Sequence, residues 1–419
     1  MKLGVTFAAL VAASIAGAAS AQTELSLWYH GAGSANAEEA LVNQLVEEFN
    51  ASQSDWKVVI ETFPQLAYND AVGAAALAGE LPDILDVDGP VMPNWAWANY
   101  MQPLGIDEAK LDGYLPGPIG RWNGEVYSVG LWDAAVALTT RRSTLEKYGI
   151  RVPTLDEPWS LDEFNGALAA IQASGDFENA LDLGMAWKGE WYPYAFSPFL
   201  QSFGGDIVDR STYQTAEGVL NGDEALAFGE WWQGLFENGY VPGTSQDAAD
   251  RETGLLDGKY AMAWNGNWAA LPVVEAFGDD ALFLPAPDFG NGSVIGAASW
   301  QFGVSATSAN PDGARAFIEF ALQDKWFAAF SDGTGLIPTT ASAAADTANY
   351  APGGSLEVFY GLSEAQALVR PVTPGYIVQA KVFEKALSDI ANGADVADTL
   401  DAAVDEINED IESNGGYGH

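Results

Sequence analysis

The sequence predicts an α/β protein with two lobes, each built on a mostly parallel sheet flanked by helices. Two observations support this prediction. Between residues 25 and 129, strand-like runs alternate with helical patterns, an order typical of parallel sheets covered by helices. In addition, 419 residues are too many for one ordinary hydrophobic core. Because the sequence shows no internal repeat, coiled coil or long linker, we expect the lobes to share crossing strands.

The chain begins with the pattern of an export signal. Met1-Lys2 provide a short basic start, residues 3–18 are apolar or small, and Ala19-Ser20-Ala21 forms a small-residue cleavage site. This pattern predicts a cleaved signal peptide over residues 1–21 and a mature protein in the periplasm. The apolar run is short for a membrane span, and no comparable stretch follows. The sequence has no cysteine, which excludes disulfides, thiolate metal sites, a cysteine nucleophile and a lipidated cysteine.

The first half of the chain shows the clearest alternation of strands and helices. Residues of alternating polarity and short apolar runs predict strands at Leu25–Tyr29, Val58–Thr62, Ile84–Val87 and Val126–Val129. Apolar residues at helical spacing predict helices at Glu38–Phe49 and Tyr68–Ala78. Ligands of such sheets gather at the carboxyl ends of the strands, so we expect the functional residues there.

A glycine turn follows the first predicted strand. His30 ends the strand, and Gly31 and Gly33 lead into the first helix. A helix start after glycines can bind phosphate. However, a dinucleotide fingerprint would need glycine where Asn36 stands, and the Gly-Lys-Ser/Thr ending of a P-loop is absent. We therefore expect the turn to offer backbone N–H groups to ligand hydroxyls, with His30 positioning or contacting the ligand.

The second half of the chain predicts further strands and helices. Ser160 and Glu163 form a capping box at the start of a helix that runs to Ile171. The other predicted helices are Ser143–Tyr148, Asp223–Glu237, Pro311–Leu322 and the acidic region Gln379–Ile411. The predicted strands are Ala134–Thr139 and a further pair, Tyr260–Trp264 and Ser299–Ser305, which bracket a loop rich in Pro and Gly.

The charge balance of the chain limits its partners. With 17 basic and 58 acidic residues, the formal net charge is −41, which makes nucleic acid and anionic membrane surfaces poor partners. The aromatic fraction is 12%, including 15 Trp residues. That fraction raises the question of whether some rings line a binding site, although core packing remains the usual role of any single ring.

Several segments in order resemble the extracellular solute-binding proteins of ABC sugar importers, the family that includes maltose-binding and glycerol-phosphate-binding proteins. The segments span most of the mature chain. They are GELPDILDVDG at 79–89, NGEVYSVGLWDAAVALTTRRSTLEKYGI at 123–150, PWSLDEF at 158–164, FGGDIVD at 203–209, LLDGKYAMAWNGNWA at 255–269, SWQFGVSATSANPDGARAFIEFAL at 299–322 and RPVTPGY at 370–376.

This resemblance implies a two-lobe periplasmic binding protein fold of type II, with the ligand in the cleft between the lobes. The chain would cross between the lobes near Trp132-Asp133, Pro285–Asp288 and Ile337-Pro338. Lobe I would then contain residues 22–132 and 288–337, and lobe II residues 133–287 and 338–419. The family also implies a monomeric protein that binds without catalysis, needs no cofactor and delivers its ligand to a membrane permease.

Two aromatic segments are candidates for contact with a sugar. Sugar rings present C–H faces and a rim of hydroxyls, so their sites combine flat aromatic surfaces with fixed polar groups. The segment AWNGNWA contributes two indoles and two amides, and WKGEWYPY crowds aromatic rings around a proline. The candidates are Trp187, Trp191, Tyr192, Trp264, Asn265, Asn267 and Trp268. The alternative role of each ring is to seal the core of its lobe.

Carboxylates provide polar candidates, because one carboxylate can accept hydrogen bonds from two sugar hydroxyls. Asp86 and Asp88 end a predicted strand, and Asp133 lies beside Trp132 at a predicted crossing. Turn formation is the alternative role of Asp88, since Gly89 follows it. The stretch DVDG also resembles part of a calcium loop, but the remaining ligands of such a loop are missing, so we predict no metal site.

Arg370 precedes Pro371 in a segment that reaches the cleft in relatives, so its planar guanidinium is a further candidate. Many relatives carry a glycine pair before the strand at 300, where this chain has Ser299 and Trp300, which suggests that a hydroxyl or a ring contributes here. The complete set of ligand-binding candidates is His30, Asp88, Trp132, Asp133, Trp187, Trp191, Tyr192, Trp264, Asn265, Asn267, Trp268, Ser299, Trp300 and Arg370.

The sequence leaves two alternatives to a carbohydrate-binding protein. A glycerol phosphate or a glycerophosphodiester would need cationic groups, and Arg370, Arg121 and Lys188 are the candidates. A secreted glycoside hydrolase would also combine aromatic surfaces with paired carboxylates. We expect a carbohydrate ligand, because the resemblance spans nearly the whole chain and cationic candidates are few.

Overall fold

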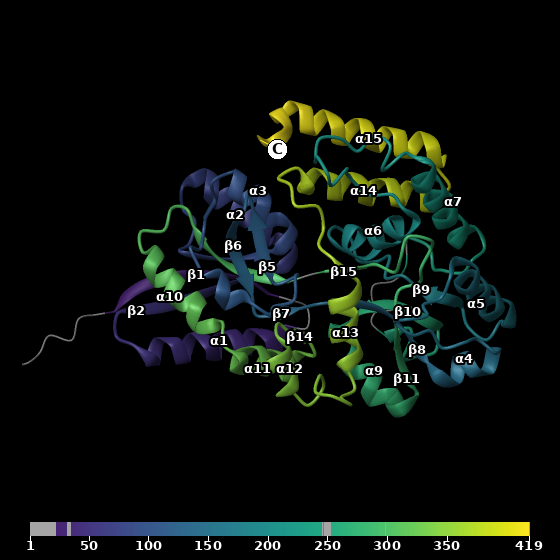
Figure 1. Cartoon of the computed structure of the whole chain (residues 1–419), viewed down its shortest axis with the longest axis horizontal. Helices are drawn as coiled ribbons and strands as arrows, with labels where there is room; N and C mark the ends of the chain where they lie inside the picture. The colour runs from purple at the N-terminus through teal and green to yellow at the C-terminus, as the bar shows by residue number, and fades with distance from the viewer. Residues whose placement is uncertain (1–21, 32–34, 245, 247–252, 298, 419) are drawn as a thin grey trace, which may run out of the picture.

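The computed structural model describes residues 22–31, 35–244, 246, 253–297 and 299–418. The predicted signal peptide and most of the glycine turn lie outside these residues. Among the helices of the described part of the chain, none combines the length and apolar character that crossing a bilayer requires. Figure 1 shows two bodies side by side, and each has its own sheet and its own helices. The two predicted lobes are therefore present.

Lobe I is built on a seven-stranded sheet with the order β2-β1-β3-β13-β6-β5, and β4 also pairs with β13. Its strands are β1 (Thr23–Gly31), β2 (Trp56–Pro64), β3 (Ile84–Asp88), β4 (Met101–Gln102), β5 (Ile119–Trp122), β6 (Glu125–Gly130) and β13 (Trp300–Ser305). Its helices are α1 (Ala35–Ser52), α2 (Gln65–Ala78), α3 (Met92–Trp97), α10 (Pro311–Ala321), α11 (Asp324–Thr334) and α12 (Ala341–Ala345).

Both faces of the lobe I sheet are buried. Leu25 and Leu27 of β1 pack in one hydrophobic cluster with α1, α10 and α11, whereas Trp28 packs in a second cluster with α2 and α3. This alternation follows from the two-residue period of a strand. The predicted strand Leu25–Tyr29 and the predicted helix Glu38–Phe49 are confirmed, and each lies within a longer element of the same type.

Lobe II is built on a four-stranded sheet with the order β11-β8-β10-β9. Its strands are β8 (Val136–Arg141), β9 (Asn179–Asp182), β10 (Tyr260–Gly266) and β11 (Ala281–Leu284). Its helices are α4 (Arg142–Tyr148), α5 (Leu161–Ser174), α6 (Trp191–Phe203), α7 (Asp223–Glu237), α9 (Ala270–Phe277), α13 (Glu357–Gln366), α14 (Tyr376–Ala391) and α15 (Val396–Ser413). Figure 1 shows α14 and α15 stacked along one side of this lobe.

The two sheets are mixed, which corrects the prediction that they are mostly parallel. In lobe I only β1 pairs in parallel, with β2 and β3, whereas β13 runs antiparallel to β3, β4 and β6. In lobe II only β9 and β10 are parallel. The prediction failed because β13 enters lobe I from the other lobe, so it does not follow a local strand-helix-strand unit. For the same reason the predicted pair Tyr260–Trp264 and Ser299–Ser305 lies in two different sheets.

One short ladder joins two of the segments that pass between the lobes. The strand β7 (Trp132–Asp133) pairs antiparallel with β14 (Ile337–Pro338), so two of the predicted crossings lie side by side. The third crossing comes later than the predicted position at residues 285–288. Phe289 and Ile295 pack in the lobe II core, and β12 (Ile295–Gly296) pairs with β15 (Ala367–Leu368). The helix α12 packs against α11 of lobe I, although the predicted division placed residues 338–419 in lobe II. The exact division of the chain between the lobes stays a prediction.

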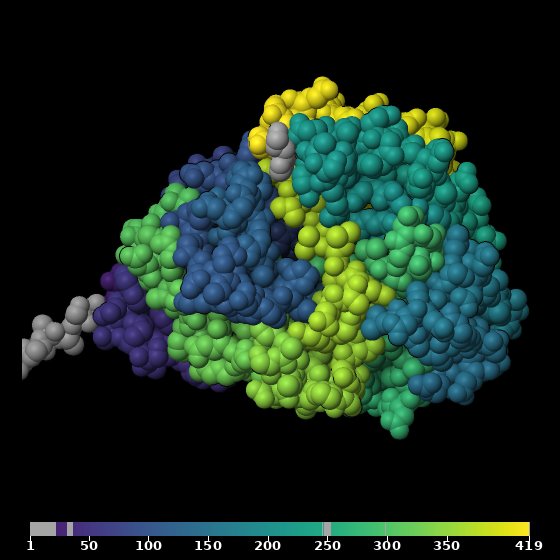
Figure 2. Space-filling view, in the orientation of Figure 1, coloured from purple at the N-terminus to yellow at the C-terminus, as the bar shows by residue number. Residues whose placement is uncertain are grey.

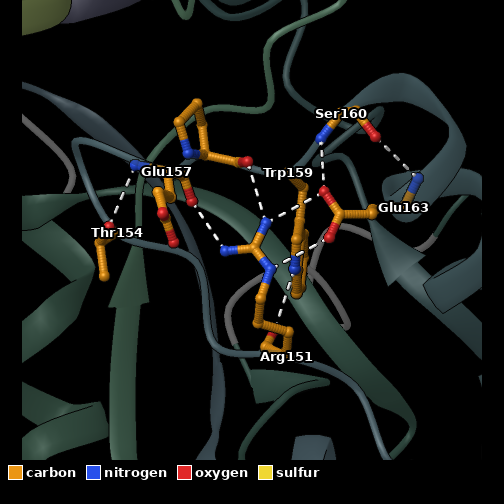
Figure 3. A network of polar contacts seen from close by, with 7 residues as sticks. Arg151, Thr154, Glu157, Trp159, Ser160 and Glu163 are labelled. Atoms are coloured by element: carbon orange, nitrogen blue, oxygen red, sulfur yellow. Dashed lines mark hydrogen bonds and ion pairs between the residues drawn. The ribbon is translucent and has the colours of Figure 1, made fainter.

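The start of α5 confirms the predicted capping box (Figure 3). The Ser160 hydroxyl accepts from the Glu163 backbone N–H at 3.3 Å, and the Glu163 carboxylate accepts from the Ser160 backbone N–H at 3.1 Å. Arg151 donates from Nε and Nη2 to the same carboxylate, both at 3.0 Å. Arg151 also donates to the backbone oxygens of Glu157 and Pro158. We call Arg151, Glu163 and Ser160 the capping network.

Candidate functional site

The two lobes meet beside a hollow. Figure 2 shows it between the blue surface of lobe I and the yellow-green segment of lobe II. At the edge of this region, the Asn94 side chain of α3 donates to the backbone oxygen of Pro374 at 2.9 Å. The rings of Trp97 and Tyr417 also meet edge to face, with centroids 5.1 Å apart. The lobes are therefore in contact.

A charged group joins the lobes in this region, and we call Asp88, Glu190, Arg370 and Tyr376 the inter-lobe network. Asp88 ends β3, Glu190 precedes α6, and Arg370 follows β15. Arg370 forms an ion pair with Glu190 through Nη1 and lies with Nη2 at 3.7 Å from the Asp88 carboxylate. Tyr376, the first residue of α14, donates its hydroxyl to Glu190. One guanidinium thus lies between carboxylates from both lobes.

Burial controls the protonation of this network. The Arg370 side chain is 3% exposed and that of Asp88 is 12% exposed. Burial raises the pKa of Asp88 above its ordinary value, although Arg370 opposes this effect. Burial also raises the pKa of Glu190 to about 7, again against the attraction of Arg370. Burial lowers the pKa of Arg370, but the facing carboxylates outweigh it and keep the guanidinium charged.

An aromatic cluster adjoins the inter-lobe network on lobe II. We call Trp187, Trp191, Tyr194 and Trp268 the aromatic cluster. The Trp268 centroid lies 5.9 Å from that of Trp187, 6.2 Å from that of Trp191 and 6.1 Å from that of Tyr194. Trp187 and Trp268 are partly exposed, whereas Trp191 and Tyr194 are buried. The Arg370 guanidinium lies over the Tyr194 ring at 5.1 Å, so charge and aromatic surface are continuous.

Two glycines make room for the aromatic cluster. A Cβ at Gly266 would overlap the Trp268 ring, and a Cβ at Gly296 would overlap Tyr194. Gly266 ends β10 directly before the short helix that carries Trp268. The indole can therefore lie against bare backbone, which explains why the predicted segment AWNGNWA needs its central glycine.

Lobe I contributes Trp300 and His30 to the same region. Trp300 begins β13 and pairs directly with Asp88 of β3, so their side chains are neighbours on one face of the sheet. The His30 imidazole stacks on the Trp300 indole with centroids 3.7 Å apart. The structure thus brings together predicted candidates that are 270 residues apart in the sequence.

Three predicted candidates lie in the core of lobe II instead of at its surface. Trp264 is 2% exposed, donates from Nε1 to the Ala195 backbone oxygen at 3.0 Å and packs on Phe199. Tyr192 is fully buried. Asn267 is also fully buried, and its amide bonds the backbone on both sides of the lobe connection. These three side chains have no accessible surface for a sugar, so we assign them structural roles.

The candidates near the crossings hold the backbone. The Ser299 hydroxyl donates to the Trp132 backbone oxygen at 2.6 Å, which ties the third crossing to the first. Asp133 is fully buried and accepts from the Ser363 hydroxyl of α13. Asn265 is partly buried, and its side-chain oxygen accepts from the next backbone N–H, that of Gly266, at 2.8 Å.

Sequence reasoning missed several residues of the site. Glu190 lies inside the segment WKGEWYPY, where only the aromatic residues suggested a binding role. Tyr376 follows RPVTPG and gave no signal beyond that segment. Tyr194 was apparent as part of the aromatic segment but was not among the candidates. The Tyr194 hydroxyl and Arg370 Nε are buried without a hydrogen-bond partner among the described residues. Buried polar atoms are usually paired with a protein group or ordered water, so these two can accommodate a ligand group or a water.

The described residues contain no group of three or more His, Asp or Glu side chains placed to hold a metal ion. What the site offers is a flat aromatic surface next to fixed hydrogen-bond donors. That combination suits a ligand with apolar faces and a polar rim.

Known proteins similar to this chain include a curated relative and two solved structures. One relative is an uncharacterized lipoprotein in the oleD 5' region of Streptomyces antibioticus, 25% identical over 320 residues that cover 74% of this chain and 69% of the relative. The GacH receptor of Streptomyces glaucescens has a TM-score of 0.76 at 22% identity, covering 95% of this chain and 99% of that protein. The cyclic alpha-maltosyl-1,6-maltose binding protein of Arthrobacter globiformis has a TM-score of 0.77 at 21% identity, covering 94% and 100%.

These two likenesses show the two-lobe binding-protein fold that the sequence predicted. Residues 44–353, which make up most of the chain, match the family described as bacterial extracellular solute-binding protein. The chain belongs to the bacterial extracellular solute-binding proteins.

Proposed function

We propose that this protein binds a carbohydrate, without catalysis, in the inter-lobe region and delivers it to the permease of an ABC importer. The observation that carries the proposal is the partly exposed Trp268 ring of the aromatic cluster, beside the inter-lobe network. An indole surface next to hydrogen-bond donors matches a sugar ring, which has C–H faces and a rim of hydroxyls.

The unpartnered polar atoms support a neutral polyhydroxylated ligand. Arg370 Nε can donate to a sugar oxygen, and the Tyr194 hydroxyl can donate or accept. The ligands of two similar proteins point to the same chemistry. GacH is described in complex with acarbose, and the Arthrobacter protein as binding cyclic alpha-maltosyl-1,6-maltose. We therefore propose an oligosaccharide as the ligand.

An anionic ligand such as a glycerophosphodiester is the weaker candidate. Arg370 is already engaged with Glu190 and lies near Asp88, so a phosphate would compete with two carboxylates. Arg121 is paired bidentately with Glu108, at 2.7 and 2.6 Å. Lys188 lies over the Tyr192 ring, 5.4 Å from its centroid. The cationic candidates therefore have partners, whereas the Tyr194 hydroxyl and Arg370 Nε have none among the described residues.

A glycoside hydrolase would need an acid and a second carboxylate on either side of the scissile bond. The raised pKa of Glu190 would suit a general acid, but its carboxylate is held by Arg370 and Tyr376. We propose that this carboxylate holds Arg370 in place beside Asp88 of lobe I and does not transfer protons to substrate. Incubation with malto-oligosaccharides tests this, because release of reducing ends would establish catalysis.

The proposed role includes export and assembly. We propose that residues 1–21 are cleaved, that the mature protein is a periplasmic monomer and that the permease recognises its ligand-bound form. The ligand-binding candidates that remain in the proposal are Asp88, Trp187, Trp191, Trp268, Trp300 and Arg370, together with Glu190, Tyr194 and Tyr376.

Calorimetric titration with maltose, maltotetraose, cyclodextrins and glycerophosphocholine tests the ligand class. We expect binding of a neutral oligosaccharide, and Trp268→Ala should weaken it by about tenfold or more because a stacking surface is lost. The matched control is Trp264→Phe, which changes a core indole and should leave the affinity intact. Binding of glycerophosphocholine alone, or equal affinity of the Trp268→Ala variant, would refute the proposal.

A further inference from the structure

His30 lies behind the lobe I side of the site, in contact with Trp300. It is 1% exposed, and its imidazole is nearly parallel to the Trp300 indole, at an interplanar angle of 12° and a centroid distance of 3.7 Å. The Tyr68 ring meets the same indole edge to face at 5.7 Å. Trp300 itself is only partly buried. Its exposed surface is therefore separate from the face that His30 covers.

Carboxylates flank both nitrogens of the His30 ring. Nδ1 contacts the Asp86 carboxylate, which also accepts from the His30 backbone N–H at 3.3 Å. Nε2 lies 3.8 Å from the Glu38 carboxylate of α1. Two flanking carboxylates favour the doubly protonated cation, although burial also raises the pKa of Asp86 and of Glu38. A cation on the face of an indole is attracted by the ring quadrupole, most strongly where water is excluded.

The surrounding groups favour the charged form. Burial lowers the pKa of His30, but Asp86, Glu38 and Asp88 outweigh it and raise the pKa above the ordinary value. Two tyrosines complete the titratable surroundings of this cation. Tyr29 donates its hydroxyl to Glu38, and the Tyr68 hydroxyl accepts from the Asp86 backbone N–H at 3.1 Å. Burial raises the pKa of both phenols well above the usual range, so they stay neutral.

The Trp300 indole is placed to form a wall of the site. It pairs with Asp88, whose carboxylate lies 3.7 Å from Arg370 of lobe II. We propose that His30, as an imidazolium, is a positioning residue that holds Trp300 as the lobe I surface on which the carbohydrate stacks. This inference rests on the proposed function. It assigns the carbohydrate two aromatic walls, Trp300 from lobe I and Trp268 from lobe II, and makes affinity depend on the charge of His30.

Two measurements without ligand test the positioning of Trp300. Carbon-13 NMR of labelled histidine should give a His30 pKa above 6.5, resolved from the only other histidine, His419. The fluorescence difference between the wild type and Trp300→Phe should change as His30 titrates, because a stacked imidazolium quenches indole emission. That change should be absent in His30→Gln. An identical pH dependence in His30→Gln, or a His30 pKa at or below 6.5, would overturn the inference.

Affinity for maltotetraose provides the functional readout between pH 5.5 and 9. The wild type should bind tightly at low pH and lose affinity as pH rises through the His30 pKa. His30→Gln should bind about five- to tenfold more weakly at pH 6 because the cation–π contribution is gone, and should lose less affinity as pH rises, since Glu190, with a pKa of about 7, still titrates there. Equal affinity and an equal pH profile of the two proteins would overturn the inference. Absence of any carbohydrate binding by the wild type would instead refute the proposed function. The two measurements without ligand would still test whether His30 positions Trp300.

Discussion

Two arginines in this protein each bind carboxylates, and their surroundings give opposite results. In the capping network, Arg151 and Glu163 are 39% and 44% exposed, and the arginine lowers the pKa of Glu163 to about 2 (Figure 3). In the inter-lobe network, Arg370 is 3% exposed, and burial raises the pKa of its partner Glu190 to about 7 despite the same kind of bond. The difference lies in the burial of the network and in the nearby Asp88 carboxylate, which also raises the pKa of Glu190, and not in the type of interaction.

This comparison separates a stabilising contact from a functional one. In the exposed network, water already solvates both charges, so the ion pair contributes little to the free energy of unfolding and its loss costs little. In the buried network, each charge depends on the others, and removal of one leaves the rest without compensation. In the inter-lobe network, the group affected is the one that places Arg370 of lobe II beside Asp88 of lobe I.

The largest expected effect is that of Arg370→Met. The variant would leave Asp88 and Glu190 facing each other without a cation, and loss of one partner of a buried ion pair is expected to lower the free energy of unfolding by about 3–5 kcal/mol. Glu190 keeps 33% of its side chain exposed, so the lower end of that range is expected. Urea denaturation at pH 8 measures the change. A loss no larger than that of Arg151→Met would remove the distinction between the two networks.

The second effect is a pair of opposite pH dependences. A folded-state pKa of about 7 for Glu190 lies above the unfolded value of about 4.3. Its contribution is therefore fully present below pH ~4.3 and lost as pH rises through 7. For Glu163 the folded-state pKa is about 2, so its contribution is present above pH ~4.3 and lost as pH falls toward 2.

Denaturation midpoints of Glu190→Gln and Glu163→Gln, compared with the wild type from pH 3 to 8, measure these dependences. Glu190→Gln should gain on the wild type between pH 5 and 8, because it lacks the carboxylate that must ionise in a buried place. Glu163→Gln should reduce the loss of stability that the wild type shows as pH falls toward 3, and should leave the dependence above pH 5 unchanged. His30 also has a raised pKa and contributes a slope of the same sign as Glu190, so the difference between variant and wild type is the relevant quantity. Slopes of one sign in both variants would contradict the assignment.

The same comparison shows what the sequence could predict. The capping network depends on residues three positions apart, so Ser160 and Glu163 were recognisable without any tertiary information. The first strands and helices were predictable because their period reflects burial on the two faces of one sheet. The inter-lobe network joins Glu190 to Arg370 across 180 residues, and no local pattern connects them.

The choice between core and site was also beyond local pattern. Trp264 and Trp268 belong to one short segment, yet Trp264 lies on β10 and points into the lobe II core, whereas Trp268 follows the strand end and stays partly exposed. Both residues are tryptophans in the same segment, so neither residue type nor local sequence separates the core residue from the site residue. Only the position of the strand end relative to the lobe contact distinguishes them, and that position is a tertiary property.

Ser160→Ala tests a smaller contribution. The substitution removes the acceptor of the Glu163 backbone N–H and leaves the ion pair with Arg151 in place. Loss of an N-cap serine is expected to lower the free energy of unfolding by about 1 kcal/mol. Thermal and urea denaturation measure the change, and Ser160→Asp, which keeps a capping oxygen, should restore most of it. A loss with Ser160→Asp equal to that with Ser160→Ala would show that the cap is not the cause.

The smallest expected effect is that of Arg151→Met, the counterpart of Arg370→Met. It removes two bonds to Glu163 and two to backbone oxygens, all at an exposed place where water takes over the released groups. We expect a loss of about 0–1 kcal/mol, decreasing further in 0.5 M NaCl because salt screens exposed pairs. The loss in Arg370→Met should change little with salt, since the buried pair is shielded from ions. Equal salt sensitivity of the two variants would mean that water reaches the inter-lobe network in solution, and the lobes would then be apart in the unliganded protein.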